Sequence, residues 1–178
     1  NPSGRLIKKN YIENMLQNNK KTWFLIDEAY IEFSNSSCLD LIEKYQNLVI
    51  FRTFSKAFGL AGIRIGYVLS NKKNIKEFNK VRNGKEVNPL GQAIASAALN
   101  HKNEFFHYIE EINLLRDTCC FQLNNIENVK IINTNSNFFL IQSQQNQSMV
   151  NFLKKNNIFI RNRDGMHGMN NTSRITIG

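Results

Sequence analysis

The sequence predicts an α/β fold with a mostly parallel sheet and flanking helices, followed by a smaller C-terminal α+β domain. Three short apolar runs, at residues 22–26, 48–51 and 65–69, predict buried strands. Helical or loop segments separate these runs, and that alternation is typical of parallel strands joined by right-handed crossovers. We expect residues 1–104 to form part of the larger domain and residues 105–178 the smaller one.

Between the predicted strands of residues 1–104, apolar side chains recur at helical spacing and predict helices. The helix that includes the alanine-rich stretch is expected to start at Asn88 and Pro89, since Asn suits the cap and Pro the first turn. The predicted helical segments are residues 9–19, 39–45, 74–81 and 88–99.

The C-terminal part combines helices with short strands. A long helix over 104–123 carries one apolar stripe, formed by Phe105, Tyr108, Ile109, Ile112, Leu115 and Cys119. A second helix is expected at 148–155. The predicted strands are residues 129–132, 137–141, 158–161 and 174–177.

Composition is that of an ordinary globular protein, with 42% hydrophobic and 21% charged residues among 178. No apolar run approaches the roughly 20 residues that a membrane span requires. No charged and then apolar leader opens the sequence. We therefore expect a cytoplasmic protein with no membrane contact.

The net charge of +9 raises the possibility of nucleic-acid binding. Much of the excess lies in residues 71–85, where a solvated helix face explains the lysines and an anionic small substrate is also compatible. No recognition helix, zinc spacing or aromatic-basic motif accompanies this charge. A nucleic-acid-binding or regulatory module stays an alternative, although we expect no nucleic-acid partner.

Cysteine and histidine usage predicts neither a disulfide framework nor a metal site. The cysteine count is odd, and Cys119 and Cys120 are adjacent, which disfavours a bridge between them. Together with Cys38 they are expected to be free thiols. The three histidines show no metal-ligand spacing.

Both ends of the sequence predict a piece of a larger fold. Residues 1–4 have turn chemistry, as expected after a strand that is not present. Residues 173–178 are typical of a strand, and nothing follows them. A site assembled from several segments would then be incomplete in this chain.

Residues 52–67 place a lysine, two hydroxyls and an arginine close together beside apolar runs. A lysine in such a setting can lose its proton through desolvation and attack a carbonyl, which assigns this role to Lys56. Thr53, Ser55 and Arg64 suit a dianionic phosphate. A carbonyl and a phosphate on one ligand indicate pyridoxal phosphate.

A second cluster follows the first predicted strand. Asp27 emerges at the strand's end, where an acid can keep a proton on a heterocyclic nitrogen; a helix cap or structural ion pair is the alternative. Tyr30 either hydrogen-bonds the cofactor's ring oxygen or packs, and Glu28 is expected to be structural. Because ligands bind beyond the carboxyl ends of parallel strands, Asp27 and Lys56 are predicted to share one site.

Four segments together closely resemble fold-type I aminotransferases of class I/II, in the branch that contains histidinol-phosphate aminotransferase. They are residues 1–4, 27–33, 52–67 and 173–178, and they fall in the family's order. The resemblance implies the large domain and small domain of that fold, pyridoxal 5'-phosphate as cofactor, and a homodimer. It also implies that an N-terminal half, with further cofactor contacts, is absent from these residues.

The resemblance implies a role for each matching residue. Lys56 corresponds to the Schiff-base lysine that then acts as general base, and Asp27 to the partner of the pyridinium nitrogen. Asn1 and Tyr30 correspond to contacts of the ring hydroxyl. The phosphate is assigned to Thr53, Ser55 and Arg64, and the substrate's carboxylate or its counterpart to Arg174, with Arg161 nearby.

The implied reaction transfers an amino group between an amino acid or phosphorylated amine, similar to histidinol phosphate, and a 2-oxo acid. Decarboxylation of a phosphorylated amino acid on the same fold is the alternative. Residues 81–90 are more polar than the pattern associated with histidine biosynthesis, so the substrate stays open at this point.

Overall fold

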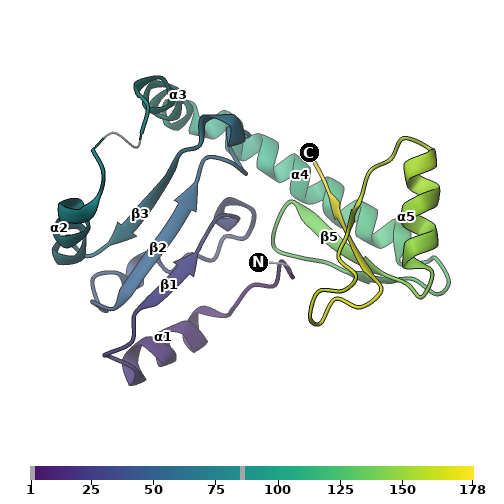
Figure 1. Cartoon of the computed structure of the whole chain (residues 1–178), viewed down its shortest axis with the longest axis horizontal. Coiled ribbons are helices and arrows are strands. Elements are labelled where there is room, and N and C mark those ends of the chain that lie inside the picture. The colour runs from purple at the N-terminus through teal and green to yellow at the C-terminus, as the bar shows by residue number, and fades with distance from the viewer. Residues whose placement is uncertain (1–2, 85–86) are drawn as a thin grey trace. The chain divides into compact units, whose positions relative to one another are not determined.

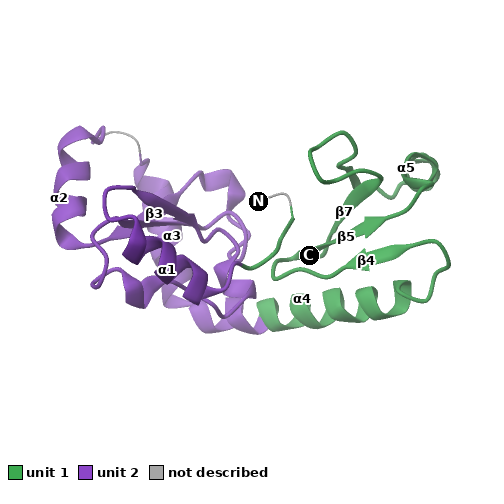
Figure 2. Ribbon diagram, turned by 90° about the horizontal axis from the view of Figure 1, so that it is seen from below, with its two compact units in different colours: residues 1–6, 108–178 green, residues 7–107 purple. Residues whose placement is uncertain are grey.

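The computed structural model describes residues 3–84 and 87–178 (Figure 1). The chain divides into two compact units, one of residues 7–107 and the other of residues 108–178 with the N-terminal segment up to Leu6 (Figure 2). The predicted domain boundary between residues 104 and 105 stays a prediction.

The unit of residues 7–107 contains a three-stranded sheet in the order β1-β2-β3. Strand β1 (Phe24–Asp27) runs parallel to β2 (Leu48–Thr53), and β3 (Gly66–Ser70) runs antiparallel to β2 (Figure 1). The three predicted strands are therefore present, but the prediction of a mostly parallel sheet is wrong for β3. Between β2 and β3 the chain forms a turn and the short 3-10 helix η3 (Ala61–Ile63), and no crossover helix carries it back.

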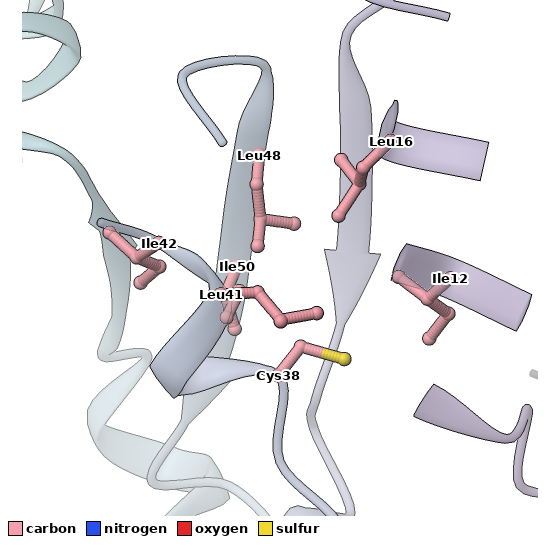
Figure 3. Close-up of a cluster of buried hydrophobic side chains, with 7 residues drawn as sticks. All are labelled: Ile12, Leu16, Cys38, Leu41, Ile42, Leu48 and Ile50. Carbon is pink, nitrogen blue, oxygen red and sulfur yellow. The ribbon is translucent and has the colours of Figure 1, made fainter. Parts of the chain in front are cut away.

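One face of this sheet is covered by helix α1 (Lys9–Asn18) and the segment after residue 37. Ile12 and Leu16, one helical turn apart, point to the same side of α1, and Leu48 and Ile50 point to the same face of β2. The buried cluster in Figure 3 consists of Ile12, Leu16, Cys38, Leu41, Ile42, Leu48 and Ile50. This packing holds the two parallel strands in place and so fixes where they end.

Asparagine side chains cap two helices of this unit, and the cap at Asn88 is the one that the sequence predicted. Helix α2 (Lys72–Val81) starts after Asn71, whose side chain accepts a hydrogen bond from the Asn74 amide. Helix α3 (Pro89–Asn100) starts after Asn88, whose side chain accepts from the Gly91 amide at 2.6 Å. Both helices are confirmed.

The helix predicted over residues 39–45 is wrong, because only a 3-10 helix η2 (Leu39–Leu41) and turns form there. The segment is held at its start by the Cys38 amide, which donates to the Glu28 carboxylate, and β2 begins at Leu48. A second 3-10 helix, η1 (Ile31–Phe33), follows β1.

The other unit contains a four-stranded sheet in the order β4-β5-β7-β6, with every pair antiparallel. Its strands are β4 (Lys130–Ile132), β5 (Phe138–Gln142), β6 (Arg161–Asn162) and β7 (Thr172–Thr176). The helices are α5 (Asn146–Lys155) and the part of α4 (Lys102–Leu123) from Tyr108 onward. Parallel pairing, predicted for most of the sheet, therefore occurs only between β1 and β2 in the described residues.

Helix α4 buries a stripe that differs from the predicted one. Ile109 and Ile112 are buried as expected, but Leu115 is 55% exposed. The stripe continues instead through Arg116 and Cys120, at four-residue spacing. Arg116 is buried because its guanidinium donates to the Ser136 carbonyl at 2.7 Å and to the Asp117 carboxylate.

Within residues 3–84 and 87–178, no helix is long and apolar enough to cross a membrane. Over the same residues, no group of three histidine, cysteine or acidic side chains is arranged to hold a metal ion. The three cysteines are free.

Candidate active site

The parallel pairing of β1 and β2 brings two predicted site segments to the same edge of the sheet. Asp27, the last residue of β1, is the register partner of Phe51, and Thr53 ends β2 two residues later. Lys56 follows in the next turn, and its Nζ lies 5.5 Å from the centre of the Tyr30 ring. The structure thus brings together the lysine and the turn that follows Asp27.

Asp27 is exposed, and its carboxylate is oriented by the backbone. Its Oδ1 accepts a hydrogen bond from the Ala29 amide at 2.9 Å. In the described part of the chain, Oδ2 accepts no hydrogen bond from another residue. One carboxylate oxygen is therefore available to a ligand at this edge.

Glu28 points to the opposite side and is buried, as expected for a structural residue. Its Oε1 accepts from the Cys38 amide at 2.7 Å, and its Oε2 accepts from Arg52 Nε at 3.0 Å. Ser37 donates to the same carboxylate, and Arg52 Nη2 donates to the Ser37 hydroxyl at 2.8 Å. This network ties the ends of β1 and β2 to the segment that covers them.

Burial acts to lower the pKa of Arg52, but its hydrogen bonds to Glu28 and Tyr67 raise it overall. Sequence reasoning did not single out Arg52. A signal was present, since alternation along β2 points Arg52 away from Thr53, toward the covered face where a guanidinium requires a partner.

The two hydroxyls predicted to bind phosphate are neighbours. Thr53 Oγ1 lies 2.9 Å from Ser55 Oγ and 3.3 Å from the Ile65 carbonyl oxygen, and it accepts from the Ser55 amide at 3.1 Å. The β2–β3 pairing sets Gly66 opposite Thr53, and Arg64 lies two residues before Gly66 in the sequence.

Arg64 adopts a left-handed backbone conformation, with φ 57° and ψ 39°. A non-glycine residue in this region costs about 1–3 kcal/mol, which is typical of functional sites. Its side chain is exposed, and within the part of the chain that the structure describes its hydrogen bond is a long one, 3.4 Å from Nη1 to the Ala61 carbonyl oxygen. The guanidinium is therefore accessible to an anion.

Lys56 itself is exposed, and the turn that carries it packs on buried aromatic side chains. The Gly59 amide donates to the Lys56 carbonyl at 3.0 Å, which closes the turn. Phe54 and Phe58 are buried on either side of the lysine, with their ring centres 5.1 Å apart, and Phe58 also contacts Phe105 at 5.1 Å. The sequence analysis did not identify this aromatic packing, although Phe54 and Phe58 each lie two residues from Lys56 in the sequence.

The predicted substrate residues lie in the other unit and face each other across a strand pair. Arg161 of β6 and Arg174 of β7 are direct register partners. The guanidinium of Arg174 lies 5.1 Å from the centre of the Phe138 ring, and its Nε is buried without a hydrogen-bond partner among the described residues. Asn1 lies outside the described residues.

A family model described as aminotransferase class I and II matches residues 1–177. The chain belongs to this family. The sequence resemblance stated above is therefore confirmed, including the likeness to histidinol-phosphate aminotransferases.

Curated relatives in the class I and II family are similar to the whole chain. A dihydroxyacetone phosphate transaminase of Campylobacter jejuni is 40% identical over 190 aligned residues, covering 100% of this chain and 49% of that protein. A histidinol-phosphate aminotransferase of Ruminiclostridium cellulolyticum is 35% identical, covering 100% of this chain and 50% of that protein. The chain thus spans about half the length of the curated relatives it matches.

Solved structures show the same fold. L-threonine-O-3-phosphate decarboxylase of Porphyromonas gingivalis superposes with a TM-score of 0.87 at 27% identity, covering 100% of this chain and 57% of that one. Histidinol-phosphate aminotransferase of Sinorhizobium meliloti, solved in complex with pyridoxal-5'-phosphate, also gives 0.87 at 27% identity, covering 99% and 50%.

The residues of unit 7–107 fit the chemistry of pyridoxal phosphate. An accessible amine at Lys56 suits its aldehyde, and the available oxygen of Asp27 suits its ring nitrogen. The paired hydroxyls of Thr53 and Ser55, with the accessible guanidinium of Arg64, suit its phosphate.

Proposed function

We propose that this chain supplies the lysine-bearing part of a pyridoxal-phosphate-dependent aminotransferase. The observation that carries the proposal is the contact of Lys56 with Tyr30, just past the ends of the parallel strands that carry Thr53 and Asp27. Family membership and the cofactor in the Sinorhizobium meliloti relative support pyridoxal phosphate. The whole enzyme transfers an amino group to a 2-oxo acid.

When bound, the cofactor supplies a carbonyl that takes up the amino group and a ring that accepts an electron pair. Lys56 would hold the cofactor through its aldehyde, and the lysine amine would move the proton at the substrate's α carbon. Asp27 holds the proton on the ring nitrogen, which keeps the ring electron-poor. Tyr30 would contact the ring hydroxyl, a role that the sequence resemblance also gives to Asn1.

The phosphate is held by the other groups of the turn. The backbone orients the Thr53 and Ser55 hydroxyls before any ligand binds, because each already participates in a hydrogen bond with the other. Arg64 adds a full positive charge to these neutral donors. Its unfavourable backbone conformation is compatible with that role, because strain tends to persist where function requires a side chain in one place.

The donor of the amino group is proposed to be an amino acid or a phosphorylated amine. Phosphate esters occur in the names of the Campylobacter, Ruminiclostridium and Porphyromonas relatives. Arg161 and Arg174 support this class, because two directly opposed cations repel each other unless an anion lies between them. The unpartnered Nε of Arg174 is a donor available to that anion.

Decarboxylation of a phosphorylated amino acid is the second candidate. The similarity to L-threonine-O-3-phosphate decarboxylase favours it specifically. Both reactions use the same lysine and acid, and they differ in which bond at the α carbon breaks. A homodimer and a cytoplasmic location stay predictions.

The decisive experiment uses the full enzyme with pyridoxal phosphate and a panel of phosphorylated amines and amino acids. Amino transfer to 2-oxoglutarate and release of CO2 are measured side by side. We expect amino transfer with a phosphorylated amine and none with the Lys56→Ala variant, because no other amine occupies the turn. Borohydride should fix the cofactor to Lys56, as mass spectrometry of the peptide would show.

Lys72→Ala is a matched control, since it removes an exposed lysine of α2 outside the proposed site. This variant should keep full activity. The assignment would be contradicted if Lys56→Ala turned over as fast as the parent enzyme, or if borohydride fixed the cofactor to a different lysine. CO2 release without amino transfer would replace the first candidate by the second.

A further inference from the structure

A second hollow lies at the opposite edge of the same sheet from Lys56. It has a volume of about 340 Å³ and lies where β1 and β2 begin and α2 starts. Its lining residues are Lys20, Lys21, Trp23, Gln46, Asn47, Lys73, Asn74, Glu77 and Phe78. The six residues of β2 separate it from the lysine turn by roughly 20 Å.

The floor of this hollow is held by two asparagines. Asn47 Nδ2 donates to the backbone carbonyls of Asn19 and Thr22, at 3.1 and 3.0 Å. Asn74 is buried, and its Nδ2 donates to the Gln46 carbonyl at 2.7 Å and to the Ser70 hydroxyl at 2.9 Å. These bonds fix the loop before β1, the start of β2 and the first turn of α2 against one another, so the hollow is formed in advance.

The charge around the hollow is positive. Among the described residues, Lys20, Lys21 and Lys73 form no salt bridge. The single acid in the lining, Glu77, is already paired with Lys80 at 2.7 Å. Three like charges around one cavity repel each other, and a bound anion would relieve that repulsion.

Aromatic rings form part of the wall. Trp23 is 53% exposed, and its ring centre lies 6.2 Å from that of Phe78, with the planes tilted by 49°. An exposed indole beside cations offers a flat apolar surface on which a planar ring can stack. Trp23 belongs neither to the lysine turn nor to the buried cluster of this unit.

We propose that this hollow is a second binding site, for a small organic phosphate that carries a planar ring, such as a nucleoside monophosphate. The lysines bind the phosphate, and the indole of Trp23 stacks on the ring. The volume lies within the range of small-ligand pockets. The site does not depend on which reaction the lysine turn catalyses, since it shares none of that turn's residues.

Trp23 is the single tryptophan in the 178 residues, and comparison with the Trp23→Leu variant assigns the indole signal of the full enzyme to it. The full enzyme is titrated with AMP, adenosine and inorganic phosphate, by calorimetry and by indole fluorescence. We expect AMP to bind more tightly than either partial ligand and to quench the indole. Lys56→Ala should bind AMP unchanged, which separates this site from the phosphate-binding turn.

Two variants test the two halves of the site. The triple variant K20A/K21A/K73A should weaken AMP binding by about tenfold or more, because charge-assisted bonds to phosphate are lost. Trp23→Leu, followed by calorimetry, should keep the binding of inorganic phosphate and lose the preference for AMP. Melting temperatures of both variants show that folding is retained.

The triple variant K8A/K154A/K155A is the charge-matched control, since it removes three exposed lysines elsewhere. It should bind AMP as the parent protein does. Equal weakening in both triple variants would mean non-specific attraction to a basic protein and would overturn the proposal. Absence of AMP binding in the parent protein, or AMP binding lost in Lys56→Ala, would overturn it as well.

Discussion

Glu28 Oε2 lies 2.9 Å from Arg52 Nη2, and this buried ion pair joins the two strands that carry the proposed site. Glu28 follows Asp27, and Arg52 precedes Thr53, so each partner is the sequence neighbour of a site residue. The pair lies on the covered side of the sheet, while its neighbours face the open edge. The spacing of the two site residues therefore depends on an interaction that does not touch the ligand.

Glu28→Gln should destabilise the protein by about 3 kcal/mol, since it leaves the Arg52 guanidinium, 17% exposed, without its counter-charge. Chemical denaturation monitored by circular dichroism measures the loss. Glu77→Gln is the matched control, because that acid also pairs with a basic residue but on an exposed helix surface. If the free energy of unfolding fell equally in both variants, burial of the Glu28–Arg52 pair would add nothing to its contribution to stability.

Gly66→Ala tests the close approach of β3 to β2. A Cβ at Gly66 would lie 2.8 Å from the Arg52 carbonyl oxygen, which belongs to the backbone and cannot rotate away. We expect a destabilisation of about 1–3 kcal/mol, as for overpacking elsewhere. Thermal denaturation measures it, with Gly62→Ala as control.

At Gly62 a Cβ would meet nothing within 4 Å, so that variant should be neutral or slightly stabilising. A neutral result at Gly66 would mean that the two strands separate easily at this point. The register that sets Gly66 opposite Thr53 would then not be fixed by this close approach.

Local chemistry made much of the first unit predictable. The strands of the sheet are apolar runs, and the cap at Asn88 marks where α3 begins. The turn at Lys56 and the acid at Asp27 could be assigned to one sheet edge because parallel strands end on the same side. These predictions rest on features that short segments determine by themselves.

Long-range pairing was not predictable in the same way. The direction of β3 depends on how residues 54–65 turn, and their composition fits a crossover as well as a reversal. The stripe of α4 shifted because Arg116 could be buried only once Ser136 and Asp117 were available as partners. The periodicity of a segment contains no information on hydrogen-bond partners, such as the Ser136 carbonyl, that come from distant parts of the chain.

Arg161→Gln should change stability and substrate affinity in opposite directions. Removing one of two directly opposed cations should stabilise the fold slightly, by less than about 1 kcal/mol, because the repulsion with Arg174 disappears. The same change should raise the KM for a phosphorylated amine about tenfold, because a charge-assisted contact is lost. Steady-state kinetics and thermal denaturation of one preparation test both effects.

Lys155→Gln, at the end of α5, removes a charge from the same unit and should alter neither quantity. This prediction rests on the proposed function. A raised KM for Arg161→Gln without any gain in stability would show that the two arginines do not repel in the free protein. Unchanged KM would remove Arg161 from the substrate site while leaving the lysine assignment intact.

Burial raises the pKa of the Cys38 thiol to about 11, and the pKa of Cys120 to about 11 for the same reason. In the unfolded chain these thiols ionise near their ordinary pKa of 9.0. The neutral thiols therefore contribute stability that is fully present below about pH 9 and is lost as the pH rises toward 11. Urea denaturation at pH 8, 9.5 and 10.5 should show this decline.

Tyrosines and lysines also titrate in that range, so the test compares variants rather than pH values alone. Cys38→Ala should weaken the decline, while Cys119→Ala, at a half-buried position, should leave it as steep as in the parent protein. Alkylation by iodoacetamide at pH 8 should modify Cys119 before Cys38 and Cys120, since a buried neutral thiol is a poor nucleophile. Preferential alkylation of Cys38 would mean that the core beneath β1 and β2 opens readily, and the proposed site would then lack its rigid support.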